Sequence, residues 1–188
     1  NVTITLNRNF RNSKEILLFT RSVFPNFMIP QNTINGAKST GLKPIMKINI
    51  GWDVDSQTDE IIDIIGDFQS DTHNIAVLVP TQNMVDSYYN AIRAKLDNKI
   101  ALTKFKAEDD NFGGLSGVHI TPFKSSKGTE FDTVIIPEFD KYAWFIQNGH
   151  TVKENDYYVA FTRAKSNLFL ICRNNYPNIG DANTIVIE

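Results

Sequence analysis

Two arginines in polar, turn-like segments are the residues best suited to chemistry on phosphate. Arg11 lies in the segment Asn9-Phe10-Arg11-Asn12, and Arg163 follows Ala160-Phe161-Thr162 near the other end of the sequence. An arginine side chain is always protonated and presents a rigid fork of donors that fits phosphate oxygens. A fold that brings Arg11 and Arg163 together would therefore build half of a triphosphate site.

A glycine-rich phosphate loop, the other half of such a site, is missing from the sequence. No segment has the pattern Gly-x-x-x-x-Gly-Lys-[Ser/Thr], in which backbone N–H groups cradle phosphates. The nearest stretch, residues 36–41, has its lysine in the wrong place and no predicted strand before it. We therefore expect the rest of a nucleotide site to lie on another domain.

The composition is that of a globular domain in a reducing compartment. The chain has 188 residues, 41% of them hydrophobic, which is enough for a full core. With a net charge of −2, the protein has no overall positive potential that would attract nucleic acid, so any contact with nucleic acid needs a local groove. The single cysteine, Cys172, lies in an apolar segment and is predicted to be a buried thiol. With no membrane-spanning apolar run and no signal peptide, the sequence predicts a cytoplasmic protein with no membrane partner.

Hydrophobic periodicity predicts helices that alternate with strands. The first helix is expected to begin at Asn12, with Glu15 completing a capping box, and to end at Pro25. Further helices are predicted to begin at Ser56 and Thr81 and to cover residues 154–164. Strands are predicted over residues 44–50, 75–79, 118–121, 133–137, 168–172 and 184–187, with loops over 30–43 and 97–116 and a loop or short irregular element over 140–153. This alternation predicts an α/β fold, a single domain over residues 1–188 with a mostly parallel sheet flanked by helices on both faces.

Three segments of the chain resemble motifs IV, V and VI of superfamily 1 DNA helicases of the UvrD/Rep/PcrA type. Residues 6–12 are similar to L-x-x-N-Y-R-S, and residues 157–165 to L-Y-V-A-x-T-R-A-x. Residues 118–134 are similar to motif V, whose core is T-x-H-x-x-K-G-L-E-F. The motifs occur in the family's order, so the resemblance implies the C-terminal RecA-like motor domain, a P-loop-NTPase-type fold that lacks the P-loop. Residues 13–117 have room for about two strand–helix units, which implies the compact branch without the large accessory insertion.

The resemblance implies an ATP site completed by an absent N-terminal RecA-like domain. Arg11 and Arg163 would reach the γ-phosphate as arginine fingers. Phe10 stands where the family's tyrosine stacks on adenine, although packing against the first helix is an alternative role for this ring. Mg²⁺ would accompany ATP, with its ligands in the N-terminal domain. Because the chain begins without Met, we expect it to be a segment of a longer protein.

Motif V implies contacts with both nucleotide and single-stranded DNA. Glu130 would accept a hydrogen bond from the ribose hydroxyl, and Lys127 and Gly128 begin the turn that presents it. Residues 124–126 are the implied DNA contacts: Lys124, Ser125 and Ser126. Pro122 and Lys124 stand where the family has threonine and histidine, and proline has no N–H to donate to a phosphate.

Two other functions remain open from the sequence. A RecA-like binding module with a relic nucleotide site would fit the departures at Pro122 and Lys124, and the domain could also belong to a helicase-nuclease subunit. The two tryptophans, Trp52 and Trp144, are expected to be core or half-buried residues rather than platforms for base stacking.

Overall fold

Seven parallel strands form one sheet in the computed structural model, which describes residues 11–105, 116–148, 152–175 and 177–188. The strand order is β3-β4-β2-β5-β6-β1-β7. The strands are β1 (Ile45–Lys47), β2 (Asn74–Val79), β3 (Leu102–Lys104), β4 (Gly117–Pro122), β5 (Phe131–Ile136), β6 (Ala164–Ile171) and β7 (Val186–Ile187). Each neighbouring pair is parallel, so all strands start at one edge of the sheet and end at the other.

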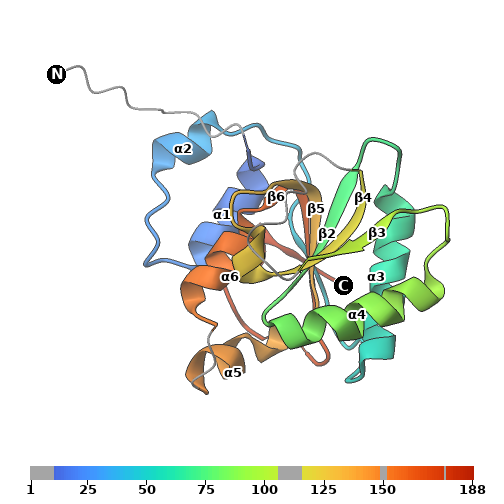
Figure 1. Cartoon of the computed structure of the whole chain (residues 1–188). Coiled ribbons are helices and arrows are strands. Elements are labelled where there is room, and N and C mark those ends of the chain that lie inside the picture. Colours follow the sequence, from blue (N-terminus) through green and yellow to red (C-terminus); the bar gives the residue numbers. More distant parts are fainter. Residues whose placement is uncertain (1–10, 106–115, 149–151, 176) are drawn as a thin grey trace.

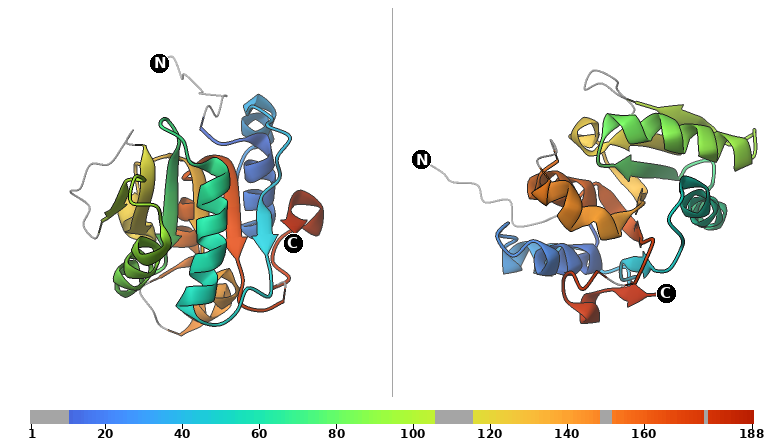
Figure 2. Two further views of the ribbon diagram at one scale, coloured as in Figure 1. Left: turned by 90° about the vertical axis from the view of Figure 1, so that its right-hand side faces the viewer. Right: turned by 90° about the horizontal axis from the view of Figure 1, so that it is seen from below.

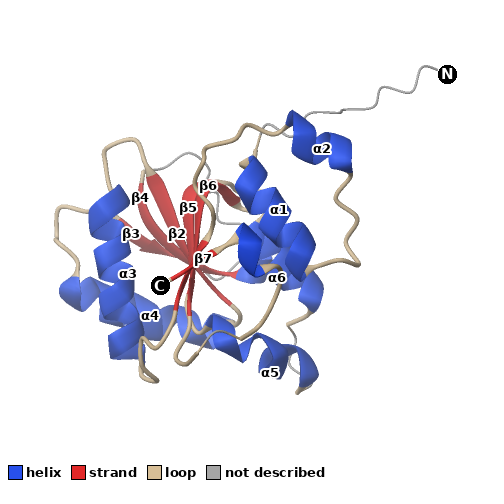
Figure 3. Ribbon diagram, turned by 180° about the vertical axis from the view of Figure 1, so that it is seen from behind, coloured by secondary structure: helices blue, strands red, loops and turns tan. Residues whose placement is uncertain are grey.

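Helices cover both faces of the sheet (Figure 1, Figure 3). They are α1 (Lys14–Val23), α2 (Gln31–Gly36), α3 (Val54–Phe68), α4 (Gln82–Lys95), α5 (Tyr142–Gln147) and α6 (Glu154–Phe161). The view from below in Figure 2 shows the strands separating α3 and α4 from α1. The predicted α/β architecture, with a parallel sheet between two layers of helices, is confirmed. No helix in these described ranges is long and apolar enough to cross a bilayer.

The central strands read as continuous apolar runs because both of their faces are covered. Every residue of β2 is buried, as the run Ile75 to Val79 predicts. On the face covered by α3 and α4, the strand side chains pack on residues such as Ile61, Tyr88 and Ile92. Cys172 is buried directly after β6, and burial raises the pKa of its thiol to about 12, which confirms the prediction of an unreactive core thiol.

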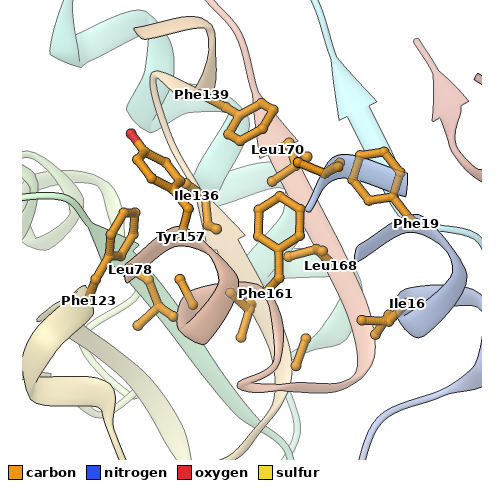
Figure 4. Packing of buried hydrophobic residues seen from close by; sticks show 14 of the residues in the cluster. Ile16, Phe19, Leu78, Phe123, Ile136, Phe139, Tyr157, Phe161, Leu168 and Leu170 are labelled. Carbon is orange, nitrogen blue, oxygen red and sulfur yellow. The ribbon is translucent and has the colours of Figure 1, made fainter. Parts of the chain in front are cut away.

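Aromatic rings join α1 and α6 on the other face of the sheet (Figure 4). The Phe19 and Phe161 rings are stacked with their centroids 5.7 Å apart, and Phe139 contacts Phe161 at the same centroid distance. Truncation of a buried phenylalanine to alanine costs about 3–5 kcal/mol, so this cluster holds the two helices firmly. It therefore fixes the position of the segment before α1 relative to the segment after α6.

The start of α1 differs from the prediction. Ser13, not Asn12, is the N-cap, and its hydroxyl accepts from the backbone N–H of Ile16. Glu15 does not complete a capping box; its carboxylate accepts hydrogen bonds from Ser39, Thr40 and Gly41 in the loop after α2. The predicted cap at Ser56 is also wrong, because Asp53 caps α3 and accepts from the Ser56 N–H.

Two short elements, α2 and β3, were not predicted from the sequence. α2 lies within the predicted loop 30–43, and β3 lies within the predicted loop 97–116. Both are short: α2 buries only Ile34, and β3 is a sheet-edge strand with no fully buried residue. β7 lies within the predicted strand 184–187 and pairs with β1 at the other edge of the sheet.

The prediction for the tryptophans is wrong for Trp52, while Trp144 is half-buried as predicted. Trp52 is 66% exposed and Trp144 is 50% exposed. Trp52 lies in the loop between β1 and α3, where no periodic pattern surrounds the indole, so its exposure could not be predicted from the sequence.

Candidate functional site

Arg163 and Glu130 lie at the sheet edge where the strands begin. Arg163 directly precedes β6 and Glu130 directly precedes β5, and the two strands are neighbours in the sheet. The backbone N–H of Phe131 donates to the carbonyl of Arg163 at 2.9 Å, so the hydrogen bonding between β5 and β6 begins at this edge. The parallel pairing thus brings motif V and motif VI side by side.

The segment before α1 is joined to the same edge by hydrogen bonds. The side-chain amide of Asn12 donates to the carbonyls of Thr162 (2.9 Å) and Ala164 (2.7 Å). The backbone N–H of Ser13 donates to the carbonyl of Lys165 at 2.8 Å. The three acceptor carbonyls lie on both sides of Arg163 in the sequence. The bonds therefore hold Arg11, the neighbour of Asn12, close to Arg163, although about 150 residues separate the two arginines in the sequence.

The side chains of Arg11, Glu130 and Arg163 form one charged group. The Nε of Arg11 lies 2.9 Å from Oε1 of Glu130. Burial lowers the pKa of the Arg163 guanidinium from its ordinary value, the charge of Glu130 raises it and the charge of Arg11 lowers it. Arg163 therefore sits within electrostatic reach of both partners.

Backbone carbonyls hold the Arg163 guanidinium in place. Its Nε donates to the carbonyl of Val159 at 3.1 Å and its Nη1 to the carbonyl of Thr129 at 3.0 Å. Its Nη2 donates to the hydroxyl of Thr162 at 3.3 Å. A guanidinium has five N–H donors, so these bonds fix its orientation and leave donors for a further acceptor.

Both arginines line one cavity of about 380 Å³. Its wall also includes Asn12, Thr162, the ring of Tyr158 and the segment from Met28 to Pro30. The structure thus brings together the two guanidinium groups that the sequence analysis placed on one site. Phe10 lies outside the described residues, so its role stays a prediction.

The turn before Glu130 is present as predicted, but Lys127 does not reach this cavity. Gly128 has a φ of +88°, a left-handed conformation that favours glycine, and the Thr129 N–H donates to the carbonyl of Ser126. The exposed Lys127 instead lines a separate hollow of about 220 Å³ beside Lys124. Lys127 thus lies outside the lining of the arginine cavity, and its nucleotide contact stays a prediction, whereas Gly128 shapes the turn.

A second, polar cavity of about 440 Å³ lies at the opposite edge, where β2 and β4 end. Lys124 and Ser125 line it, as expected for a DNA contact, together with Pro80, Thr81, Gln82, Asn83 and Pro122. We call this cavity the Lys124 groove. The side chains at the start of α4 were missed by the sequence analysis, although a helix predicted at Thr81 after a buried strand was a signal for a polar site there.

Ser126 is not part of the Lys124 groove. It is fully buried, and its hydroxyl donates to the carbonyl of Phe123 at 2.7 Å. The predicted DNA contact of Ser126 is therefore corrected to a structural role, which is to stabilise the short helix η1 (Phe123–Ser126).

Comparison with known proteins assigns the family. The sequence model of the UvrD-like helicase C-terminal domain matches residues 71–175, more than half of the chain. The chain belongs to this family. The UvrD-like resemblance drawn from the three motifs is thereby confirmed. No curated protein sequence matches the chain significantly.

The fold of this UvrD-like domain is also found in solved structures. The C-terminal domain of a possible DNA helicase from Lactobacillus plantarum WCFS1 superimposes with a TM-score of 0.69 at 16% identity, over 95% of this chain and 98% of that chain. An arterivirus nonstructural protein 10 (helicase) in complex with DNA superimposes with a TM-score of 0.47 at 9% identity, over 79% of this chain and 35% of that chain. The C-terminal domain of the DEAD-box protein Dbp5 superimposes with a TM-score of 0.46 at 13% identity, over 76% of this chain and 79% of that chain. The first likeness shows a RecA-like helicase fold in a domain of matching length.

Proposed function

We propose that this UvrD-like domain is the C-terminal motor domain of an ATP-dependent DNA helicase. It supplies Arg11 and Arg163 to an ATP site that an N-terminal domain with a Walker A loop completes. The observation that carries the proposal is the shared cavity of the two arginines, which hydrogen bonds from Asn12 and Ser13 hold together.

The chemical role of the arginines is to stabilise charge in phosphoryl transfer. The transition state spreads negative charge over the oxygens of the transferred group, and guanidinium groups that are already in place stabilise it without reorganisation. Arg163 meets this requirement because the carbonyls of Val159 and Thr129 fix its orientation. Mg²⁺, held by residues of the other domain, would neutralise further phosphate charge.

Glu130 has a second role in this proposal. In the described structure its carboxylate is paired with Arg11, so it orients that guanidinium before nucleotide binds. The side chain of Arg11 is 69% exposed, and an exposed pair of this kind contributes little stability. Arg11 is therefore able to exchange Glu130 for a phosphate oxygen, which frees the carboxylate for the ribose hydroxyl.

The motor step follows from a site divided between two domains. A bound γ-phosphate draws the two arginines toward the other domain and closes the cleft, and its loss on hydrolysis lets the cleft open. Alternate closing and opening moves the domains along single-stranded DNA, which this domain holds in the Lys124 groove. Lys124 serves there as a point charge for a phosphate, and the polar side chains of Thr81, Gln82 and Asn83 line the path.

Measurement of ATP hydrolysis by the intact protein tests the proposal. We expect hydrolysis to require the N-terminal domain and to be stimulated by single-stranded DNA, whereas the 188-residue chain alone does not hydrolyse ATP. The physical reason is that the chain lacks a phosphate loop. Robust hydrolysis by the purified 188-residue chain would refute the division of the site.

The same assay tests the Lys124 groove. Lys124→Ala should raise the DNA concentration needed for half-maximal stimulation and reduce the salt slope of DNA binding by about one. Lys43→Ala is the matched control, because Lys43 is an exposed lysine far from this groove, at the edge where the strands begin. Equal effects of the two substitutions would count against a specific contact by Lys124.

A non-catalytic binding module with a relic nucleotide site is the second candidate. Pro122 favours it, because proline at the end of β4 has no N–H for a phosphate. This alternative predicts no ATP hydrolysis by the intact protein, with or without DNA. Hydrolysis stimulated by DNA would rule it out.

A further inference from the structure

Trp52 is presented to solvent on a rigid loop at the sheet edge where the strands end. The loop follows β1, and its backbone pairs with the segment after β6. The N–H groups of Asn49 and Ile50 donate to the carbonyls of Asn174 (3.0 Å) and Cys172 (3.1 Å). Trp52 nevertheless remains 66% exposed, so an ordered segment displays a large apolar ring.

The backbone on both sides of Trp52 is tightly defined. Gly51 has a φ of +108°, and a Cβ at this position would lie 2.8 Å from the Cβ of Ser56, so only glycine fits. Asp53, on the other side, caps α3 through the Ser56 N–H at 2.8 Å. These constraints fix the backbone that carries the indole.

A fixed guanidinium supports one face of the indole. The Arg173 guanidinium lies 4.4 Å from the centroid of the Trp52 ring. Arg173 is itself held by Asp140, which accepts from its backbone N–H at 3.0 Å and from its Nε at 3.2 Å. The two side chains of this pair are only 14% and 7% exposed, so the support is well ordered. The opposite face of the indole is left for another planar group.

The location of Trp52 connects it to the Lys124 groove. Trp52 follows the end of β1 and the groove follows the ends of β2 and β4, so both lie at the same edge of the parallel sheet. The order β2-β5-β6-β1 places three strand spacings, about 14 Å, between the strands β2 and β1 that these two features follow. Sites for single-stranded nucleic acid extend over about 4–16 nucleotides and combine a cationic track with aromatic platforms.

We propose that Trp52, backed by Arg173, is a base-stacking platform that extends the path of single-stranded DNA from the Lys124 groove across this edge of the sheet. A base stacked on the open indole face would form a layered arrangement of guanidinium, indole and base. Such stacking is tolerant of sequence because every base has a π-face. The proposal rests on the DNA-binding function proposed above and adds a site and a contact type to it.

Tryptophan fluorescence tests the platform directly, because the chain has only two tryptophans. In a Trp144→Phe background, Trp52 is the sole reporter in the 188-residue chain. We expect a thymidine oligonucleotide of about 15 nucleotides to quench its emission, with the same midpoint as binding measured by fluorescence anisotropy of a labelled oligonucleotide. Anisotropy that rises to saturation while the Trp52 emission stays constant would overturn the proposal.

Affinities of matched variants separate stacking from other roles. Trp52→Ala should weaken oligonucleotide binding about ten-fold, and Trp52→Phe should recover much of the loss because a phenyl ring also stacks. Trp144→Ala, at the other exposed tryptophan, should leave the affinity unchanged. Circular dichroism of each variant confirms that the fold is retained.

The remaining outcomes distinguish this proposal from the function on which it rests. If Lys124→Ala weakens binding and Trp52→Ala does not, the platform is wrong and the DNA path at the groove stands. If the unmodified chain does not bind the oligonucleotide at all, both are wrong. If Trp52→Ala impairs only association with another protein, the exposed indole belongs to a protein interface and the platform is rejected.

Discussion

The side-chain amide of Asn12 joins the two segments that carry the arginines. It donates to two carbonyls that flank Arg163, and it is itself buried. The sequence suggested a helix cap for this residue, because Asn is common at N-caps and Glu15 follows at the spacing of a capping box. Tertiary bonds to a distant segment determine its role instead, and nothing in the local sequence reports them.

A different buried polar group, the Tyr157 hydroxyl, leads to a prediction about stability. It is fully buried and has no hydrogen-bond partner among the described residues. We expect Tyr157→Phe to raise the free energy of unfolding by about 1 kcal/mol, because it removes an unpaired buried group while keeping the ring. Urea denaturation with a fixed m-value measures the change.

Tyr88→Phe is the matched control for that substitution. The Tyr88 hydroxyl donates to Oε1 of Glu138 at 2.9 Å and is buried as well. Its removal leaves the buried carboxylate without this partner, so we expect a loss of about 1–3 kcal/mol. Equal losses in the two variants would show that the Tyr157 hydroxyl is not a destabilising group.

At the scale of elements, the sequence predicted best where burial sets the pattern. Apolar runs located β2, β5 and β6, and the spacing of Val85, Tyr88 and Ile92 located α4. The pattern failed for α2 and β3, because elements with few buried residues have no periodicity to detect. The start of α4 was predicted correctly, with Thr81 at the N-cap, but the pattern did not show that the polar residues there line the Lys124 groove.

The loop after α2 is attached to α1 by a pH-sensitive contact. Burial opposes ionisation of Glu15, but hydrogen bonds from Ser39, Thr40 and Gly41 outweigh it and lower the pKa of this carboxyl from 4.5 to about 2. A carboxyl whose pKa is lowered on folding stabilises the native state above its unfolded pKa, and the contribution is lost as pH falls. The contact should therefore weaken between pH 4.5 and about 2.

Glu15→Gln tests this contact. The substitution should destabilise the protein at neutral pH, and its stability should converge on that of the unmodified chain as pH falls from 4.5 toward 2. Thermal unfolding over this range measures the convergence. A difference between the two proteins that is the same at pH 7 and pH 3 would show that Glu15 ionisation does not strengthen the contact.

At the scale of the whole molecule, the two candidate sites lie at opposite edges of one sheet. Arg11, Glu130 and Arg163 lie where strands begin, and the Lys124 groove lies where strands end. Residues 123–130 run from one site to the other, and the carbonyl of Thr129 in this segment accepts a hydrogen bond from Arg163. This hydrogen bond therefore connects Arg163 directly to the segment that also carries Lys124.

Sequence motifs located much of both sites, and packing decided the rest. The motifs identified Arg11, Arg163, Glu130 and Lys124, because each is a charged residue in a distinctive segment. They could not show that Ser126 is buried, that Lys127 lines a hollow separate from the arginine cavity or that Trp52 is exposed. Those properties depend on contacts between segments that are distant in the sequence.

In the proposed function, Arg11 and Arg163 stabilise the transition state of ATP hydrolysis in the intact protein. Single-turnover hydrolysis by Arg163→Ala and Arg11→Ala variants tests it most directly, with Arg21→Ala, an arginine on α1 bound to Gln31, as the control. We expect the Arg163→Ala rate to fall about a thousand-fold or more while nucleotide binding changes little, and the control to be unaffected. Hydrolysis at the unmodified rate in both site variants would contradict the claim.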